Sequence, residues 1–189
     1  MINKSAVEAA ITDLLIALCD DPTREGLRET PRRVAALYEE ILAGYDTEPA
    51  EVIKFFDEDF CDDLIVVKNI EFHSVCEHHL LPFFGHVHIC YKPAPGKLLG
   101  LSKLARIVEM FARRLQLQEK MAGQIADLLI NEAAALGAVV IVDAEHMCIS
   151  MRGIKKIGST TTTSAVRGCF KTDKDLRDEA YKLLSRGGK

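Results

Sequence analysis

The chain has 189 residues, of which 48% are hydrophobic and 28% are charged, and its formal net charge is -4 at pH 7. This composition is typical of a globular protein and argues against intrinsic disorder. The net negative charge gives no overall attraction to nucleic acid or to an anionic membrane, so we expect neither partner, and any anionic ligand must be held by a local basic cluster.

Two helices are predicted in the N-terminal part of the chain. The stretch SAVEAAITDLLIAL has apolar residues at helical spacing, with Ser5 as the N-cap. A second helix is expected to follow Thr30, which precedes a proline suited to the first helical position, and to close at Gly44. We therefore expect residues 1–62 to form an N-terminal helical region.

A change of pattern at residue 63 begins a second region, which we expect to span 63–189. Its β-branched or alternating stretches indicate strands and its periodic stretches indicate helices. In chain order these are the strands LIVVKNIEF and GHVHICYKP, the helices SKLARIVEMFARR and EKMAGQIADLLINEAAALG, the strands AVVIVDAEHMCIS and STTTTSAVRGCF, and the helix TDKDLRDEAYKLLSR. Because the parallel strand–helix–strand alternation is absent, we predict an α+β fold with an antiparallel sheet.

The chain has six cysteines, and whether they form disulfides depends on the cellular compartment. The first residues, MINKSAVEAAITDLL, show no secretion signal, and no apolar run approaches the roughly 20 residues that span a bilayer. We therefore expect a cytoplasmic protein with reduced thiols, in which a Cys/His cluster points to metal binding or catalysis rather than to disulfides.

The stretch SVCEHHLLPFFGHVHICY contains two of the six cysteines and four of the six histidines. Two residues separate Cys76 from His79, so a tight loop can bring both side chains to one ion. Further along, His146 and Cys148 are two apart on a predicted strand and should face the same side. Both segments can therefore supply ligands to one pocket.

Three ligands, Cys76, His79 and Cys148, would leave one coordination position open. This is the arrangement of a catalytic zinc, which lowers the pKa of a bound water to about 7. His78 and His146 would then be free for proton transfer. In the plainer interpretation, the remaining cysteines are small buried apolar residues, and the strand histidines at 86 and 88 face solvent or a neighbouring strand.

A basic helix start, GLSKLAR, is the second candidate site. Ser102 stands where free backbone N–H groups and the helix dipole favour an anion, and Lys103 and Arg106 add positive charge. Arg152 follows the cysteine at 148 by four residues and can bring a guanidinium to the metal pocket. The alternative is a solvated helix face, which periodicity alone favours.

Gln118 and Glu119 lie near the start of the next predicted helix. A glutamate there can simply complement the helix dipole. It can also accept two parallel N–H bonds from the edge of a guanine-like ring.

Five stretches, in order over about 80% of the chain, resemble the GTP cyclohydrolase I family. They are DPTREGLRETPRRVA, SVCEHHLLPFFGHVHICYKP, GLSKLARIVEMFARRLQLQEKM, DAEHMCISMRGI and TTTTSAVRGCF. The resemblance implies conversion of GTP to 7,8-dihydroneopterin 3'-triphosphate and formate, the first step of tetrahydrofolate and pterin synthesis.

The resemblance also implies the site residues. Zn²⁺ would be bound by Cys76, His79 and Cys148, with His78 and His146 as acid–base groups. The triphosphate and ribose would be held by Ser102, Lys103, Arg106 and Arg152, with Ser102 also counted among the catalytic groups. Guanine would be anchored by Glu119, in a pocket lined by Gln118 and Leu101.

The fold implied is the T-fold, or tunnelling fold. It would consist of an antiparallel four-stranded sheet with helices on one face, in addition to the N-terminal helices. The resemblance implies a decamer of two stacked pentamers with active sites at subunit boundaries, in which ring closure covers the sheet edges.

Two other functions are compatible with the same residues. A structural zinc module that binds a partner protein would have four protein ligands and no bound water. Another enzyme of the same fold could act on a pterin or deazaguanine ring, but the basic helix start suits a triphosphate better than a bare base.

Overall fold

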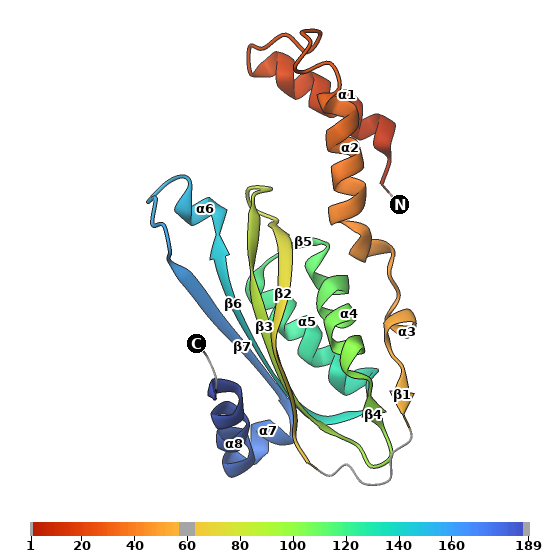
Figure 1. Ribbon diagram of the computed structural model, residues 1–189, viewed down its shortest axis with the longest axis vertical. Helices are drawn as coiled ribbons and strands as arrows, with labels where there is room; N and C mark the ends of the chain where they lie inside the picture. The colour runs from red at the N-terminus through yellow and green to blue at the C-terminus, as the bar shows by residue number, and fades with distance from the viewer. Residues whose placement is uncertain (1, 57–62, 187–189) are drawn as a thin grey trace.

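The protein is described by a computed structural model covering residues 2–56 and 63–186. Its helices are α1 (Lys4–Ala17), α2 (Thr30–Ile41), the 3-10 helix η1 (Ala43–Asp46), α3 (Pro49–Val52), α4 (Leu101–Ala112), α5 (Gln118–Asn131), α6 (Met147–Ser150), α7 (Cys169–Thr172) and α8 (Lys174–Ser185). Its strands are β1 (Phe55–Phe56), β2 (Ile65–Cys76), β3 (Pro82–Pro93), β4 (Leu98–Leu99), β5 (Leu115–Gln116), β6 (Ala135–His146) and β7 (Thr160–Gly168). The predicted order of long elements is therefore confirmed (Figure 1). The expected boundary after residue 62 adjoins residues 57–62, which lie outside the described ranges.

The main sheet has five strands in the order β5-β2-β3-β6-β7. Its four long strands pair antiparallel, as predicted. The expected count of four was too low, because the two-residue β5 pairs parallel to the end of β2. A separate two-stranded ribbon joins β1 to β4. Such short pairs are invisible to a sequence pattern, since two residues carry no periodicity.

Helices cover both faces of the main sheet, whereas one covered face was expected. The helices α4 and α5 pack on one face (Figure 1). The larger core lies between them and the sheet and includes Phe72, Ile89 and Val140. On the opposite face, α7 and α8 cover a smaller core that includes Cys90 and Val139. Adjacent residues of β3 and β6 thus enter different cores, because side chains alternate across a strand.

Several predicted helix starts are displaced by one or two residues. The cap of α1 is Asn3, whose side-chain oxygen accepts from the Ala6 N–H at 3.1 Å, rather than Ser5. Thr30 is already helical in α2. Ser102 is the second residue of α4, which is preceded by Gly100 as cap. In α1 and α4 the observed and predicted caps are both favoured residue types two positions apart, so local sequence does not choose between them.

The first two helices form an arm that projects away from the sheet (Figure 1). The helix α1 packs on α2 but buries none of its residues. Leu14, Ile16 and Leu18 are each at least half exposed. The arm therefore presents apolar surface that this single chain does not cover. Across residues 2–56 and 63–186, none of the helices combines the length and apolar character needed to span a bilayer.

Gly44 was predicted to end the second helix, but α2 ends at Ile41. Gly44 lies in η1, where the arm meets α4. Its N–H donates to the Arg113 carbonyl at 3.0 Å. A Cβ at this position would lie 2.2 Å from the Met110 oxygen and 2.7 Å from the Arg113 oxygen. Only glycine permits this approach, because both neighbours are backbone atoms of a helix end.

Gly44→Ala is expected to destabilise the fold by roughly 1–3 kcal/mol, the usual cost of overpacking. Denaturant unfolding measures the change. Gly123→Ala, inside α5, is the matched control, because its nearest contact would be an Arg167 side-chain nitrogen at 3.5 Å. That control should keep or gain stability. Equal behaviour of the two variants would contradict the close approach at Gly44.

Candidate functional site

Two thiols and one imidazole converge at one end of the main sheet. Cys76 ends β2, His79 lies in the turn before β3, and Cys148 lies in α6. Their sulfur and ring-nitrogen atoms all lie within 4.8 Å of one another. Within the described ranges this is the one group of three or more such side chains close enough to share an ion.

A tight turn places His79 beside Cys76. The Leu80 N–H donates to the Cys76 carbonyl at 2.9 Å, and the Cys76 N–H donates to the Leu81 carbonyl at 2.9 Å. Leu80 has a φ of 54°, which reverses the chain sharply. The Glu77 N–H donates to the Gln116 carbonyl at 3.0 Å, so β5 anchors the start of the turn.

The donor set is of the kind that zinc selects. Sulfur and nitrogen ligands around a tetrahedral zinc lie about 3.5–3.8 Å apart, given its usual bond lengths. Ligand atoms already within 4.8 Å therefore need little movement to bind one ion. Burial and the adjacent Cys76 raise the pKa of the Cys148 thiol, and a bound cation would offset both effects.

The prediction that His146 and Cys148 share a strand was wrong. His146 is the last residue of β6, and the chain then turns into α6, which carries Cys148. Both side chains nevertheless line one pocket. The His146 ring stacks on Phe83, its register partner on β3, with centroids 4.7 Å apart and parallel planes. Burial lowers the pKa of His146, while the charge of Glu119 acts in the opposite direction.

A small pocket of about 190 Å³ is lined by two of the three candidate ligands and by His78 and His146. It is lined by Cys76, His78, Gln116, Leu117, Gln118, Glu119, His146, Cys148, Ile149 and Thr161. Glu119 is exposed at its rim, whereas Gln118 is buried. Pockets for ligands of moderate size usually measure about 300–1,000 Å³, so this one is small for a whole nucleotide.

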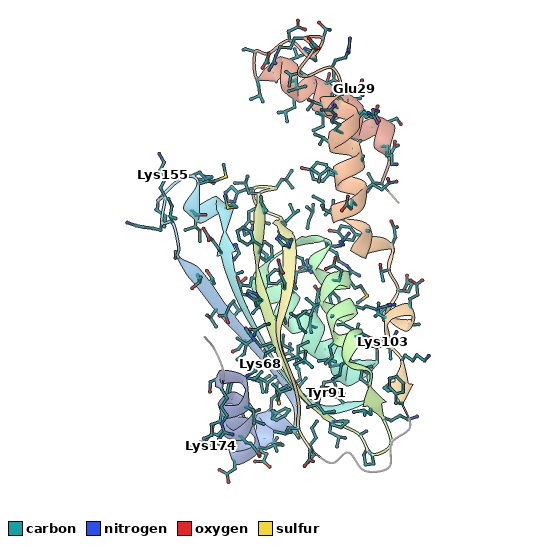
Figure 2. All side chains as sticks on the ribbon, viewed as in Figure 1. Glu29, Lys68, Tyr91, Lys103, Lys155 and Lys174 are labelled. Atoms are coloured by element: carbon teal, nitrogen blue, oxygen red, sulfur yellow. The ribbon has the colours of Figure 1, made fainter. Side chains whose placement is uncertain are left out.

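The predicted anion-binding residues lie elsewhere. Leu101, Ser102, Lys103 and Arg106 occupy the first half of α4, which follows β4 directly. Lys103 is labelled in Figure 2. The other end of α4 leads through β5 to the metal ligands. At 12 residues α4 is about 18 Å long, so one chain holds the two groups apart.

Arg152 lies near the candidate metal ligands. It is exposed in the turn after α6. Burial raises the pKa of the Cys148 thiol, and the Arg152 charge partly counteracts that effect. Of the four predicted phosphate-binding residues, it is the one near the candidate ligands in this chain.

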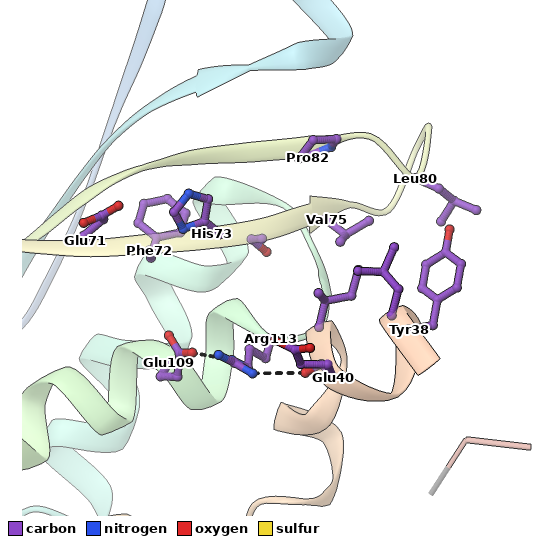
Figure 3. Close-up of a pocket in the computed structure, with 13 residues that line it drawn as sticks. Tyr38, Glu40, Glu71, Phe72, His73, Val75, Leu80, Pro82, Glu109 and Arg113 are labelled. Atoms are coloured by element: carbon purple, nitrogen blue, oxygen red, sulfur yellow. Dashed lines mark hydrogen bonds and ion pairs between the residues drawn. The ribbon is translucent and has the colours of Figure 1, made fainter. Parts of the chain in front are cut away.

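A larger cavity, of about 610 Å³, contains none of the predicted site residues. It lies between α2, the outer edge of β2 and α4 (Figure 3). Arg113 spans its floor, forming an ion pair with Glu109 and donating to the Glu40 carbonyl at 3.2 Å. Within the described residues, β2 has a strand partner on this edge only at its last two positions.

Sequence reasoning did not select three residues of the small pocket and its surroundings. Phe83 supports the His146 ring, and the Thr161 carbonyl accepts from the Gln118 amide at 2.8 Å. Gln116 is 1% exposed, and its side-chain oxygen is buried without a hydrogen-bond partner in the protein. These roles depend on strand register, which no local motif encodes.

The chain is similar to known proteins over nearly its whole length. Residues 7–185 match the family model described as GTP cyclohydrolase I. GTP cyclohydrolase 1 of Thermoanaerobacter pseudethanolicus is 51% identical over 185 residues, covering 98% of both chains. The proteins of the same name from Acetivibrio thermocellus and Bacillus pumilus are each 50% identical and cover at least 97% of both chains. A solved archaeosine synthase QueF-Like is a distant match, with 20% identity, a TM-score of 0.44 and coverage of 56% of this chain and 93% of the other.

Proposed function

Because the chain belongs to the GTP cyclohydrolase I family, we propose that it converts GTP to 7,8-dihydroneopterin 3'-triphosphate and formate, the first step of tetrahydrofolate and pterin synthesis. The observation that carries the proposal is the meeting of Cys76, His79 and Cys148 beside two further histidines. A cytoplasmic setting accords with the free thiols found at every described cysteine.

We propose Zn²⁺ as the cofactor, held by Cys76, His79 and Cys148. When bound, it would act as a Lewis acid that activates water for addition to C8 of guanine. The softness of two thiolates and one imidazole favours zinc over magnesium or calcium. Three protein ligands would leave a position for water or substrate.

The two further histidines would move protons. His78, exposed in the turn, or His146, at the pocket wall, would protonate the imidazole nitrogen of guanine as its ring opens to a formamide. A second water would hydrolyse the formamide to formate and the free amine, and the later ring closure would release one water. Ribose opening, Amadori rearrangement and closure onto the free amine would complete the product. Glu119 at the rim would accept the N1–H and the exocyclic amine of guanine, which orients C8 toward the metal.

The triphosphate would be bound across a subunit boundary. Lys103 and Arg106, with Ser102 and Leu101, would come from one chain, whereas Arg152 and the metal ligands would come from its neighbour. Support comes from the separation of the two groups along α4 and from the small volume of the metal-side pocket. Shared sites of this kind require an oligomer.

We propose that this oligomer is a decamer of two stacked pentamers. Among residues 2–56 and 63–186, the outer edge of β2 has a strand partner only at its last two positions. This edge and the far edge of β7 can pair between copies and close the sheets into a barrel. The cavity along β2 would receive part of the neighbouring copy. The exposed apolar side chains of α1 supply a further surface for contact between rings.

Incubation of the purified zinc-loaded protein with GTP tests the proposal. We expect one formate per GTP consumed and a product that becomes a fluorescent neopterin on oxidation. Lys103→Ala is expected to lose GTP binding, because it removes a phosphate contact. Lys174→Ala, at the start of α8, removes the same charge from the opposite face of the sheet and should bind normally.

Two results would contradict the proposal. Unchanged GTP binding by Lys103→Ala would remove the phosphate assignment. Four protein ligands in X-ray absorption, with no formate released, would favour the structural zinc module instead.

A further inference from the structure

Both the nitrogen and the oxygen of the Gln118 side-chain amide make hydrogen bonds inside the protein. Its nitrogen donates to the Val142 carbonyl of β6 and to the Thr161 carbonyl of β7, each at 2.8 Å. Its oxygen lies 2.7 Å from Nε2 of His146. The side chain is only 1% exposed, so water does not compete for these bonds.

The chemistry of these partners determines which way the amide faces. Backbone carbonyls only accept, so the amide nitrogen must point to Val142 and Thr161. The oxygen then faces His146, and because that oxygen also only accepts, Nε2 of His146 must carry the hydrogen. In the neutral ring the lone pair is consequently on Nδ1.

The same contacts fix the orientation of the His146 ring as well as its tautomer. The parallel stack on Phe83 restricts its plane, and the bond to Gln118 restricts rotation within that plane. The two carbonyls that hold Gln118 belong to adjacent strands of the same sheet. The two strands thus hold the Gln118 side chain in the position from which its oxygen contacts His146.

We propose that Gln118 is a positioning residue, which holds His146 as the Nε2–H tautomer and makes Nδ1 the nitrogen that exchanges a proton with the substrate. This inference rests on the proposed function, in which His146 is an acid–base group. It gives Gln118 a role that acts through His146, whereas the family resemblance implies only that it lines the guanine pocket.

The alternative is direct recognition of guanine by Gln118. Contact with a guanine acceptor would require an available amide donor, and contact with a guanine N–H would require access to an oxygen on a residue that is 1% exposed. Both donor hydrogens are already used on main-chain carbonyls. Freeing one would leave a buried carbonyl without its partner, which is costly. Glu119, one residue on and exposed at the pocket rim, has no such constraint.

A double-mutant cycle tests the proposal. Gln118→Met keeps the approximate length and removes all three bonds. It is expected to lower kcat by about 10–100-fold, the range found when a residue that orients a metal-bound histidine is removed, with KM for GTP nearly unchanged. In a His146→Ala background the same change should cause no further loss, because nothing is left to position.

Gln124→Met, six residues along α5, is the matched control. It also removes a partly buried amide contact, the 2.8 Å bond from Gln116, but does not touch His146. Its turnover should stay within about twofold of wild type, since the lost contact is an ordinary neutral hydrogen bond. Equal zinc content across all variants shows that the metal ligands are undisturbed.

Two results would overturn the positioning role. One is a raised KM with kcat unchanged, and the other is an equal loss from Gln118→Met with and without His146. Either would place Gln118 on the substrate. An inactive wild-type enzyme would instead reject the proposed function.

A measurement on the unaltered enzyme covers the case in which Gln118→Met does not fold. Histidine ¹⁵N NMR at pH 8, with the His146 signal assigned by its loss in His146→Ala, reports the tautomer directly. The Nε2–H form is expected. The Nδ1–H form would overturn the inference.

Discussion

Replacement of Cys148 by alanine is expected to release the metal and to reduce formate production by on the order of 10³-fold, because water then loses its Lewis-acid activation. The remaining ligands, Cys76 and His79, belong to one turn and close only half of the coordination shell. Metal analysis of the purified variant, alongside GTP turnover, measures both effects.

Cys19→Ala is the matched control for this prediction. Cys19 is an exposed free thiol that follows α1 on the projecting arm, so the chemical change is the same but lies outside the site. Zinc content and turnover of that variant should equal those of wild type. If Cys148→Ala retained full turnover without zinc, the metal would have no catalytic role.

Co-assembly of two inactive variants is expected to restore activity. Cys148→Ala damages the metal half of the site and Lys103→Ala damages the phosphate half. If neighbouring chains supply the two halves, about one quarter of the sites in a randomly mixed oligomer have both halves intact. If one chain supplied both halves, no mixed site would be complete. Turnover by an oligomer refolded from an equimolar mixture measures this directly.

The pair Cys148→Ala and Cys76→Ala is the control for co-assembly. Both changes damage the same half, so no chain in the mixture has an intact metal group and no activity should return. Differently tagged chains, recovered together, verify that mixing occurred. Absence of activity in a verified mixture of the first pair would place the whole site within one chain.

Element type and order could be predicted from the sequence because each long element has its own periodicity. The alternation in β3 and the helical spacing in α4 and α5 depend only on neighbouring residues. The face covered by α8 could not be predicted. Both faces of β3 and β6 carry buried side chains, such as Ile89 and Cys90, so the pattern allows a helix on either side.

The candidate metal ligands could also be predicted from the sequence, because cysteine and histidine are the residue types that bind zinc and two of them lie at a short spacing. Their convergence was not a local property. His146 and Cys148 come together through the turn into α6, and not through the shared strand that spacing suggested.

By itself, the sequence determined which side chains can bind an ion, accept a proton or attract a phosphate, since these are properties of single residues and short spacings. The tertiary structure alone decided which of them meet. Sheet register brings Phe83 to His146, and the packing of α5 on β6 and β7 brings Gln118 there. The length of α4 keeps Lys103 away from Cys148. The physical reason is that contacts between residues far apart in the chain depend on how the elements pack, and on which edges are left for another copy.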